Sequence, residues 1–208
     1  MTVFRTVFFC TFSLLLVQVS TVVAIAGDRS DRAEQLILDL SEQAKLILST
    51  TEDTLSEREI HFVKAIEGDF RFDVISEIVI GPTWQTLSST QRNLFIDLFS
   101  DFYLQAYGSQ LGGYPGDRFD ILSSSENGSR DSFVKTKLNR PKRTSVTLLW
   151  RVREFEGKPY IIDLVIDDIS VALSHREHFD GVLKDDGIEG VITLLTIRAE
   201  RLSAQPLY

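Results

Sequence analysis

Two short spacings in the chain could hold catalytic or metal-binding side chains. Ser132 and Lys135 have the spacing of the S-x-x-K motif, in which a lysine lies beside a nucleophilic serine. There the serine opens a helix, whereas the alternating residues around Ser132 predict a strand, and no S-D-N or K-T-G companion is present. His175 and His178 could share one helix face as zinc ligands, but no third ligand follows at a recognisable spacing. We therefore expect no catalytic serine and no metal site, and we interpret both histidines as surface or capping residues.

Carboxylates gather at the end of a predicted strand, at Asp163, Asp167 and Asp168. Paired carboxylates can perform acid–base chemistry or bind calcium. Because such spacing recurs by chance in an acidic chain, we interpret them as a solvated strand end. The motifs G-x-G-x-x-G, G-x-x-x-x-G-K-[ST] and G-x-S-x-G are absent, which argues against dinucleotide binding, P-loop hydrolysis and an esterase elbow. We expect a protein that is not an enzyme.

The charge balance is acidic, with 22 Lys and Arg against 30 Asp and Glu and a formal net charge of −8. Nucleic acid is therefore an unsuitable partner, since phosphate binding needs clustered basic residues on one face. The densest basic cluster is Arg140, Lys142 and Arg143. It is interpreted as solubilising a hairpin loop, with contact to anionic lipid headgroups or to an acidic partner as the alternative.

The N-terminus has the organisation of a secretory signal. Residues 1–5 carry one positive charge, residues 6–23 are apolar, and Ala24-Ile25-Ala26 supplies the small-x-small pattern of a cleavage site. A retained transmembrane anchor is the competing interpretation, since about eighteen apolar residues nearly span a bilayer. We expect residues 1–26 to be a cleaved signal peptide and residues 27–208 to form a single domain outside the cytoplasm. Cleavage changes the net charge from −8 to −9, because Arg5 is the only charged residue removed.

The hydrophobic period changes from helical to strand-like near Arg118, and then back. Helices are expected at 28–49, 56–66, 72–80 and 88–110, strands at 119–125, 132–138, 145–155 and 160–166, and closing helices at 171–182 and 188–201. Ser56 to Glu59 has the sequence of a capping box, Asn127-Gly128 suits a tight hairpin turn, and Gly112-Gly113 is expected to stop the long helix. Helices and strands that do not alternate predict an α+β fold, with a twisted antiparallel sheet of about four strands packed against a helical layer.

The helix expected at 88–110 is apolar over more of its circumference than ordinary packing requires. Its apolar side chains cover an arc of roughly 220°, against the ~100° stripe of a one-sided surface helix. Those side chains are Leu94, Phe95, Ile96, Leu98, Phe99, Phe102, Tyr103, Ala106 and Tyr107. Such a helix must be covered by protein on two sides or by an apolar ligand. Composition alone favours a filled core, whereas a helix standing off the concave face of the sheet would leave a ligand cavity.

Motifs spread over the mature chain resemble the MlaC (toluene-tolerance) family of periplasmic lipid-binding proteins. The matching residues are Phe72-Asp73, Val79-Ile80-Gly81, Trp84, Ser89, Gln91-Arg92, Phe95, Phe99, Tyr107, Trp150-Arg151-Val152, Asp168-Ile169-Ser170, residues 175–179 and residues 184–191. Departures from the family pattern are Pro82, Pro159-Tyr160 and His175. They bear more on which lipid is carried than on the fold.

The resemblance implies a periplasmic carrier with an NTF2-like fold and an apolar pocket for the acyl chains of a phospholipid, without a cofactor. It would ferry the lipid between an inner-membrane transporter complex and an outer-membrane lipoprotein complex, and so maintain the lipid asymmetry of the outer membrane. Alternatives are a hopanoid-associated carrier of the HpnM branch and an NTF2-like interaction module that carries no lipid. The residues expected to line the pocket are Phe72, Trp84, Phe95, Leu98, Phe99, Phe102, Tyr103, Val146, Leu148, Trp150, Ile162 and Leu164.

Overall fold

The computed structural model describes residues 28–49, 53–108, 116–141 and 143–204. The predicted signal peptide at 1–26, Gly112-Gly113 and Lys142 of the basic cluster lie outside these ranges. Within them, no helix is both long enough and apolar enough to cross a membrane.

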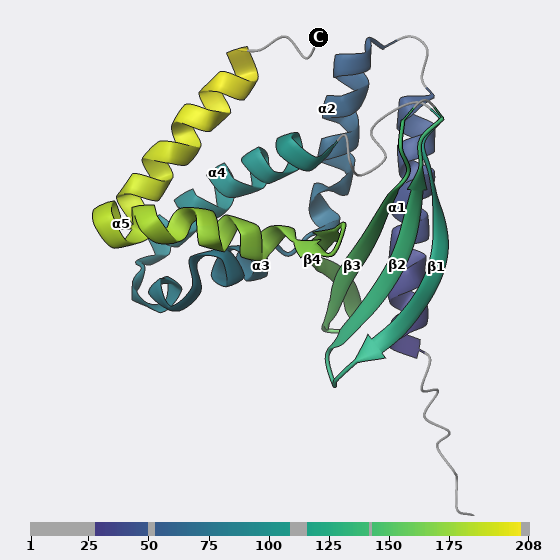
Figure 1. Cartoon of the computed structure of the whole chain (residues 1–208), viewed down its shortest axis with the longest axis horizontal. Helices are drawn as coiled ribbons and strands as arrows, with labels where there is room; N and C mark the ends of the chain where they lie inside the picture. Colours follow the sequence, from purple (N-terminus) through teal and green to yellow (C-terminus); the bar gives the residue numbers. More distant parts are fainter. Residues whose placement is uncertain (1–27, 50–52, 109–115, 142, 205–208) are drawn as a thin grey trace, which may run out of the picture.

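The elements follow the predicted order of helices, strands and helix (Figure 1). The helices before the sheet are α1 (Asp28–Leu48), α2 (Leu55–Ile66), α3 (Phe72–Ile80) and α4 (Ser89–Tyr107), with short 3-10 turns η1 (Glu67–Asp69) and η2 (Gly81–Thr86). The strands are β1 (Arg118–Asn127), β2 (Asp131–Asn139), β3 (Val146–Phe155), β4 (Lys158–Ile166) and β5 (Ile169–Ser170), and α5 (Val171–Ala204) closes the chain. All strands pair antiparallel in the order β1-β2-β3-β4-β5. The predicted α+β fold is therefore confirmed, with the two-residue β5 as an unpredicted fifth strand.

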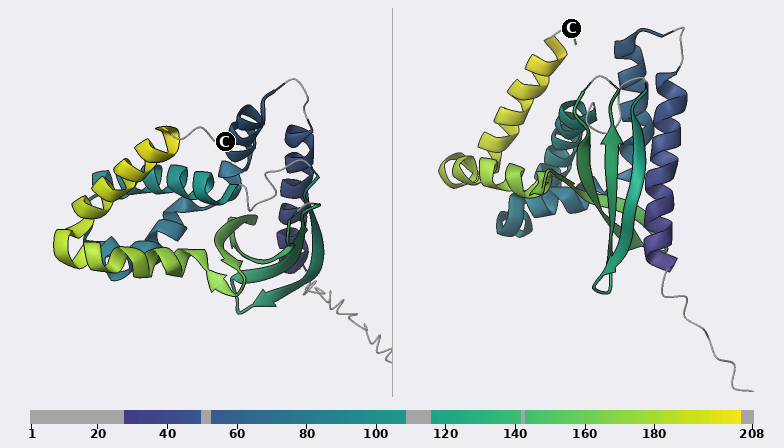
Figure 2. Two further views of the ribbon diagram at one scale, coloured as in Figure 1. Left: turned by 45° about the horizontal axis from the view of Figure 1, so that its top comes forward. Right: turned by 45° about the vertical axis from the view of Figure 1, so that its right-hand side comes forward.

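The helices form two groups around the sheet (Figures 1 and 2). Helix α1 lies along the sheet and contacts β1, β2 and β4, whereas α3, α4 and α5 pack on one another beside β4. The stripe of α1 that is buried against the core consists of Ala33, Ile37, Leu40 and Ala44, at helical spacing. The aromatic helix α4 therefore packs mainly in the second group, and α1 occupies the face of the sheet.

Two helices begin with capping boxes. The hydroxyl of Thr54 accepts from the backbone N–H of Glu57, whose carboxylate accepts from the N–H of Thr54. The predicted box at Ser56–Glu59 is thus wrong by two residues, because Thr54 is the N-cap and Glu57 returns to it. Ser88 and Gln91 form the equivalent box at the start of α4.

The turn between β1 and β2 is longer than the predicted tight turn. Asn127 pairs with Asp131, so the loop consists of the three residues 128–130. Gly128 has a φ of 61°, which a glycine adopts without steric cost. Asn127-Gly128 therefore marks the hairpin correctly but not its loop length.

A register shift in β4 changes which side chains face the core. Leu164 pairs with Trp150, whereas Ile161 pairs with Val152, so Ile162 is the extra residue of a bulge. Ile161 belongs to the apolar core with Leu164 and Trp150, while Ile162 is buried but lies outside that cluster. Strict alternation cannot place such a bulge.

Helix α5 consists of two straight arms joined at Gly187. The φ and ψ of Gly187 are 65° and −162°, far from helical values. The first arm, residues 171–186, lies in the second group of helices with α3 and α4, and the second arm, residues 188–204, turns back beside α4 (Figure 2). The two predicted closing helices are therefore both present.

Candidate functional site

The wide apolar surface of α4 is covered by protein on two sides. On one side, the Phe99 ring meets His175 and Phe179 on the first arm of α5. On the same side, the Tyr103 ring meets Phe72 on α3. On the other side the second arm approaches, with Gln91 donating to Glu189 at 3.0 Å and the Arg198 guanidinium lying 5.5 Å from the centre of the Phe102 ring.

The predicted ring residues come together in one aromatic cluster between α3, η2, α4 and α5. The centres of the Phe95 and Phe99 rings are 5.3 Å apart and stacked, and Tyr103 meets Phe99 at 5.8 Å and Phe72 at 5.6 Å. Edge-to-face and offset-stacked pairs at such distances stabilise by about 0.5–1.5 kcal/mol beyond area burial. The cluster as a whole consists of Phe70, Phe72, Trp84, Phe95, Phe99, Phe102, Tyr103, Tyr107, His175 and Phe179. Leu98 is half-buried against the core.

The predicted strand residues form a second set beneath α1. Leu148, Trp150 and Leu164 are fully buried on one face of the sheet, and Val146 is half-buried. The Trp150 indole donates to the Thr136 hydroxyl at 2.9 Å and meets the Phe119 ring edge-on at 5.6 Å. The aromatic cluster and the strand set belong to one continuous apolar core.

His175 is a central member of the aromatic cluster, which sequence analysis missed. It is buried among Phe99, Phe102, Tyr107 and Phe179, and its Nε2 lies 3.0 Å from the Tyr107 hydroxyl. Burial, with smaller contributions from the charges of Arg198 and His178, lowers the pKa of His175 from 6.5 to about 4. The expectation of a surface or capping residue is wrong for His175. Its spacing of four residues from Phe179 was the available signal.

The Tyr103 hydroxyl is buried in the same region. No hydrogen-bond partner for it is found among the described residues. Burial, followed by the nearby charge of Asp163 and by Tyr107, raises the pKa of Tyr103 well above 10. The phenol is therefore a neutral polar group in an apolar interior.

Asp163 anchors the start of α5. Its carboxylate accepts from the N–H of Leu164 at 2.9 Å, the N–H of Ala172 at 3.1 Å and the hydroxyl of Ser170 at 2.6 Å. Burial raises its pKa despite these bonds. The expectation of a solvated strand end therefore holds for the exposed Asp167 and Asp168, and is wrong for Asp163.

Replacing Asp163 with alanine is expected to lower the free energy of unfolding by about 1–2 kcal/mol, the cost of losing a helix cap. Urea denaturation followed by far-UV circular dichroism measures the change. Asp97→Ala is the matched control, since Asp97 is exposed on α4 and surface changes stay within about 0.5 kcal/mol. Equal stability of the two variants would contradict the capping role.

Comparison with known protein families identifies the family of this chain. The family model described as MlaC protein matches residues 38–196. The chain belongs to the MlaC family. The resemblance to this family that the sequence indicated is thus confirmed.

Two individual proteins similar to this MlaC-family chain bear on fold and function. The intermembrane phospholipid transport system binding protein MlaC of Haemophilus influenzae is 24% identical over 134 residues, which are 62% of this chain and 60% of that protein. The alignment therefore spans less than two thirds of the relative. The phospholipid-binding protein of Ralstonia solanacearum, solved in complex with a phospholipid, has a TM-score of 0.66 at 16% identity and covers 86% of this chain and 98% of its own. At this identity the likeness shows a shared fold.

The side chains considered for catalysis in this MlaC-family chain are not brought together. Ser132 pairs with Val152 on the core side of β2, whereas Lys135 is exposed on the opposite side of the same strand. His178 is exposed and bonds Arg198, while His175 is buried. Across the described residues, no group of three or more His, Cys, Asp or Glu could hold a metal ion.

Proposed function

We propose that this protein binds the acyl chains of a phospholipid within its apolar core and carries the lipid between inner- and outer-membrane complexes. The observation that supports this best is membership of the MlaC family together with a fold shared with a phospholipid-bound protein. The named relatives are binding and transport proteins, which is in keeping with a carrier that catalyses no reaction.

A carrier must replace the apolar contacts that a lipid loses when it leaves a bilayer. Each methylene transferred from water contributes about 0.8 kcal/mol, so two sixteen-carbon chains represent roughly 25 kcal/mol. The core joins a ring-rich helical group to an aliphatic sheet face, and both kinds of surface suit acyl chains. We propose that the chains lie between the ring residues of α4 and the strand set, with the headgroup near solvent.

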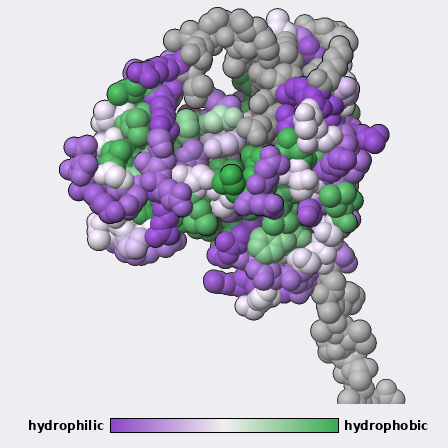
Figure 3. All heavy atoms as spheres, in the orientation of Figure 1, coloured by the Kyte–Doolittle hydropathy of each residue, from purple (hydrophilic) through white to green (hydrophobic). Residues whose placement is uncertain are grey.

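The residues proposed to contact the acyl chains are those predicted from sequence that belong to the apolar core or pack against it, which leaves out Ile162: Phe72, Trp84, Phe95, Leu98, Phe99, Phe102, Tyr103, Val146, Leu148, Trp150 and Leu164. In the space-filling view, the described surface is hollowed beside the second arm of α5, and hydrophobic side chains are among those that border it (Figure 3). This hollow is the proposed route to the core.

Native mass spectrometry of the purified protein is expected to find one phospholipid per chain. Leu98→Arg should abolish lipid retention, because an unpaired charge among acyl chains is costly to bury. Leu94→Arg is the control, since it makes the same change one helical turn away at a side chain that is 43% exposed. Circular dichroism checks that both variants fold.

The outcome separates the alternatives. A hopanoid-type lipid in place of phospholipid would assign the chain to the hopanoid-associated branch. Protein that retains no lipid and takes up none in a transfer assay would favour the interaction module. Retention by both arginine variants would remove Leu98 from the site.

A further inference from the structure

The face of the sheet opposite α1 combines basic and apolar side chains. Register places Lys135 and Lys137 of β2, Arg151 and Arg153 of β3, and Lys158 and Tyr160 of β4 on this face. Both β2 lysines and Lys158 are exposed, and the arginines and Tyr160 are partly exposed. Phe133, Leu149 and Val165 lie among them, half-buried. We name this surface the basic sheet face.

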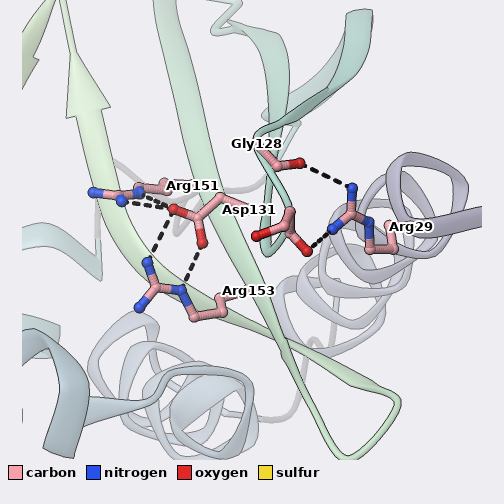
Figure 4. A network of polar contacts seen from close by, with 6 residues as sticks. Arg29, Gly128, Asp131, Arg151 and Arg153 are labelled. Atoms are coloured by element: carbon pink, nitrogen blue, oxygen red, sulfur yellow. Dashed lines mark hydrogen bonds and ion pairs between the residues drawn. The ribbon is translucent and has the colours of Figure 1, made fainter.

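A buried carboxylate fixes the two arginines in place (Figure 4). Asp131, whose side chain is 8% exposed, accepts from Arg151 at 2.6 and 2.9 Å and from Arg153 at 2.6 and 3.0 Å. These charge-assisted bonds hold the pKa of Asp131 below its usual value, although burial opposes them. Two positive charges share one negative charge, so the triad remains net positive.

Other carboxylates on this face are already engaged. Asp120 is paired with Arg118 and accepts from Asn139, and Asp163 is buried in the cap of α5. At the β3–β4 turn, the Arg71 guanidinium lies 4.0 Å from the centre of the Phe155 ring, and the Lys158 ammonium lies 4.8 Å from that of Tyr160. Cations and aromatic rings thus continue to this end of the sheet.

We propose that the basic sheet face rests on the surface of an anionic phospholipid bilayer when the protein loads or delivers lipid. This inference builds on the proposed function and names the surface on which its lipid is exchanged. The basic sheet face is complementary in charge to such a bilayer. In general, a lysine stem can lie along apolar surface with its ammonium group in water, and tyrosine suits the bilayer interface. The cations are spread over three strands around half-buried apolar residues, a pattern that fits a laterally uniform anionic surface better than the point-to-point pairing of a protein partner.

The acidic remainder of the protein does not prevent this contact. The Debye length is about 8 Å at physiological ionic strength, so charges on distant faces are largely screened from the bilayer. Each lysine or arginine near an anionic membrane surface contributes about 1 kcal/mol. The local cations therefore outweigh the net charge of −8 of the whole chain.

Vesicle co-sedimentation of the full mature protein tests the inference. Binding is expected to vesicles of phosphatidylcholine containing about one third phosphatidylglycerol, to fall with added salt, and to be absent with phosphatidylcholine alone. Lys135→Gln combined with Lys137→Gln should weaken binding about 30-fold, which corresponds to about 1 kcal/mol for each lysine. Lys45→Gln combined with Lys184→Gln is the control, because it removes the same charge from exposed positions on α1 and α5.

Lipid retention by the same samples is measured by native mass spectrometry. Loss of vesicle binding with lipid still retained in the Lys135/Lys137 variant supports the inference. The inference is overturned if the wild-type protein does not bind anionic vesicles, or if both double variants weaken vesicle binding equally. Absence of vesicle binding would point to an acidic protein as the partner of this face. Vesicle binding by protein that never retains lipid would instead contradict the proposed function.

Discussion

Replacing Trp150 with alanine is expected to lower the free energy of unfolding by about 3–5 kcal/mol, the usual cost of deleting a buried large aromatic side chain. Trp150 has no exposed surface, packs edge-on against Phe119 and donates to Thr136. It lies at the centre of the core face of the sheet, where little can collapse into the space left behind. Urea denaturation followed by far-UV circular dichroism is the suitable measurement, since the substitution also removes a fluorophore.

Thr136→Val separates the contribution of packing from that of the hydrogen bond. It keeps the shape of residue 136, removes the acceptor for the indole N–H, and should cost about 1–3 kcal/mol. A Trp150→Ala variant that loses no more stability than Thr136→Val would show that ring burial is not what stabilises this face.

Acidification from pH 6.5 to pH 4 should destabilise the wild-type protein by about 3 kcal/mol more than a His175→Phe variant. The pKa of His175 is lowered to about 4 in the folded protein, so in this window the unfolded chain binds a proton that the folded chain does not. Stability at this site is therefore fully present above pH 6.5, declines as the pH falls, and levels off below pH 4. Phenylalanine fits among the surrounding rings and cannot be protonated.

Denaturation curves at several pH values measure this difference. His175→Phe also loses the bond to the Tyr107 hydroxyl, but that loss offsets the curve without changing its slope in this window. His61→Gln is the control, because His61 is exposed and lies beside Asp53 at the surface. Parallel stability curves for wild type and His175→Phe would contradict the assignment of a buried neutral imidazole.

Periodicity was sufficient to predict the α-helices and the four long strands, but not the two-residue β5, and it identified the core faces of α4 and β3. The ring residues of α4 repeat at helical spacing, and Leu148, Trp150 and Val152 alternate along β3, so both patterns identify core faces. Sequence analysis also recognised that α4 needs cover on more than one side. It could not choose between protein and ligand, because that depends on where α5 turns back.

The remaining differences arise from tertiary contacts, and only His175, four residues before Phe179, carried a local signal. Ile162 sits at a bulge that depends on pairing with β3. The carboxylate of Asp163 caps a helix that begins eight residues later. His175 looks polar by type, but its neighbours on two helices place it among rings. In each case the deciding partner is distant in sequence or defined only by strand register.

The backbone conformation of Gly187 sets the angle between the two arms of α5. Its φ of 65° and ψ of −162° lie in a region of backbone space that is essentially restricted to glycine. Apart from its chain neighbours and the adjacent backbone of its own helix, no atom of the described residues lies within 4 Å of where a Cβ would stand. The restriction is therefore one of torsion and not of space. A side chain at this position would fit, but the backbone torsions that it allows would change the direction of the second arm of α5. Helix α4 would then lose the protein cover on one of its two sides.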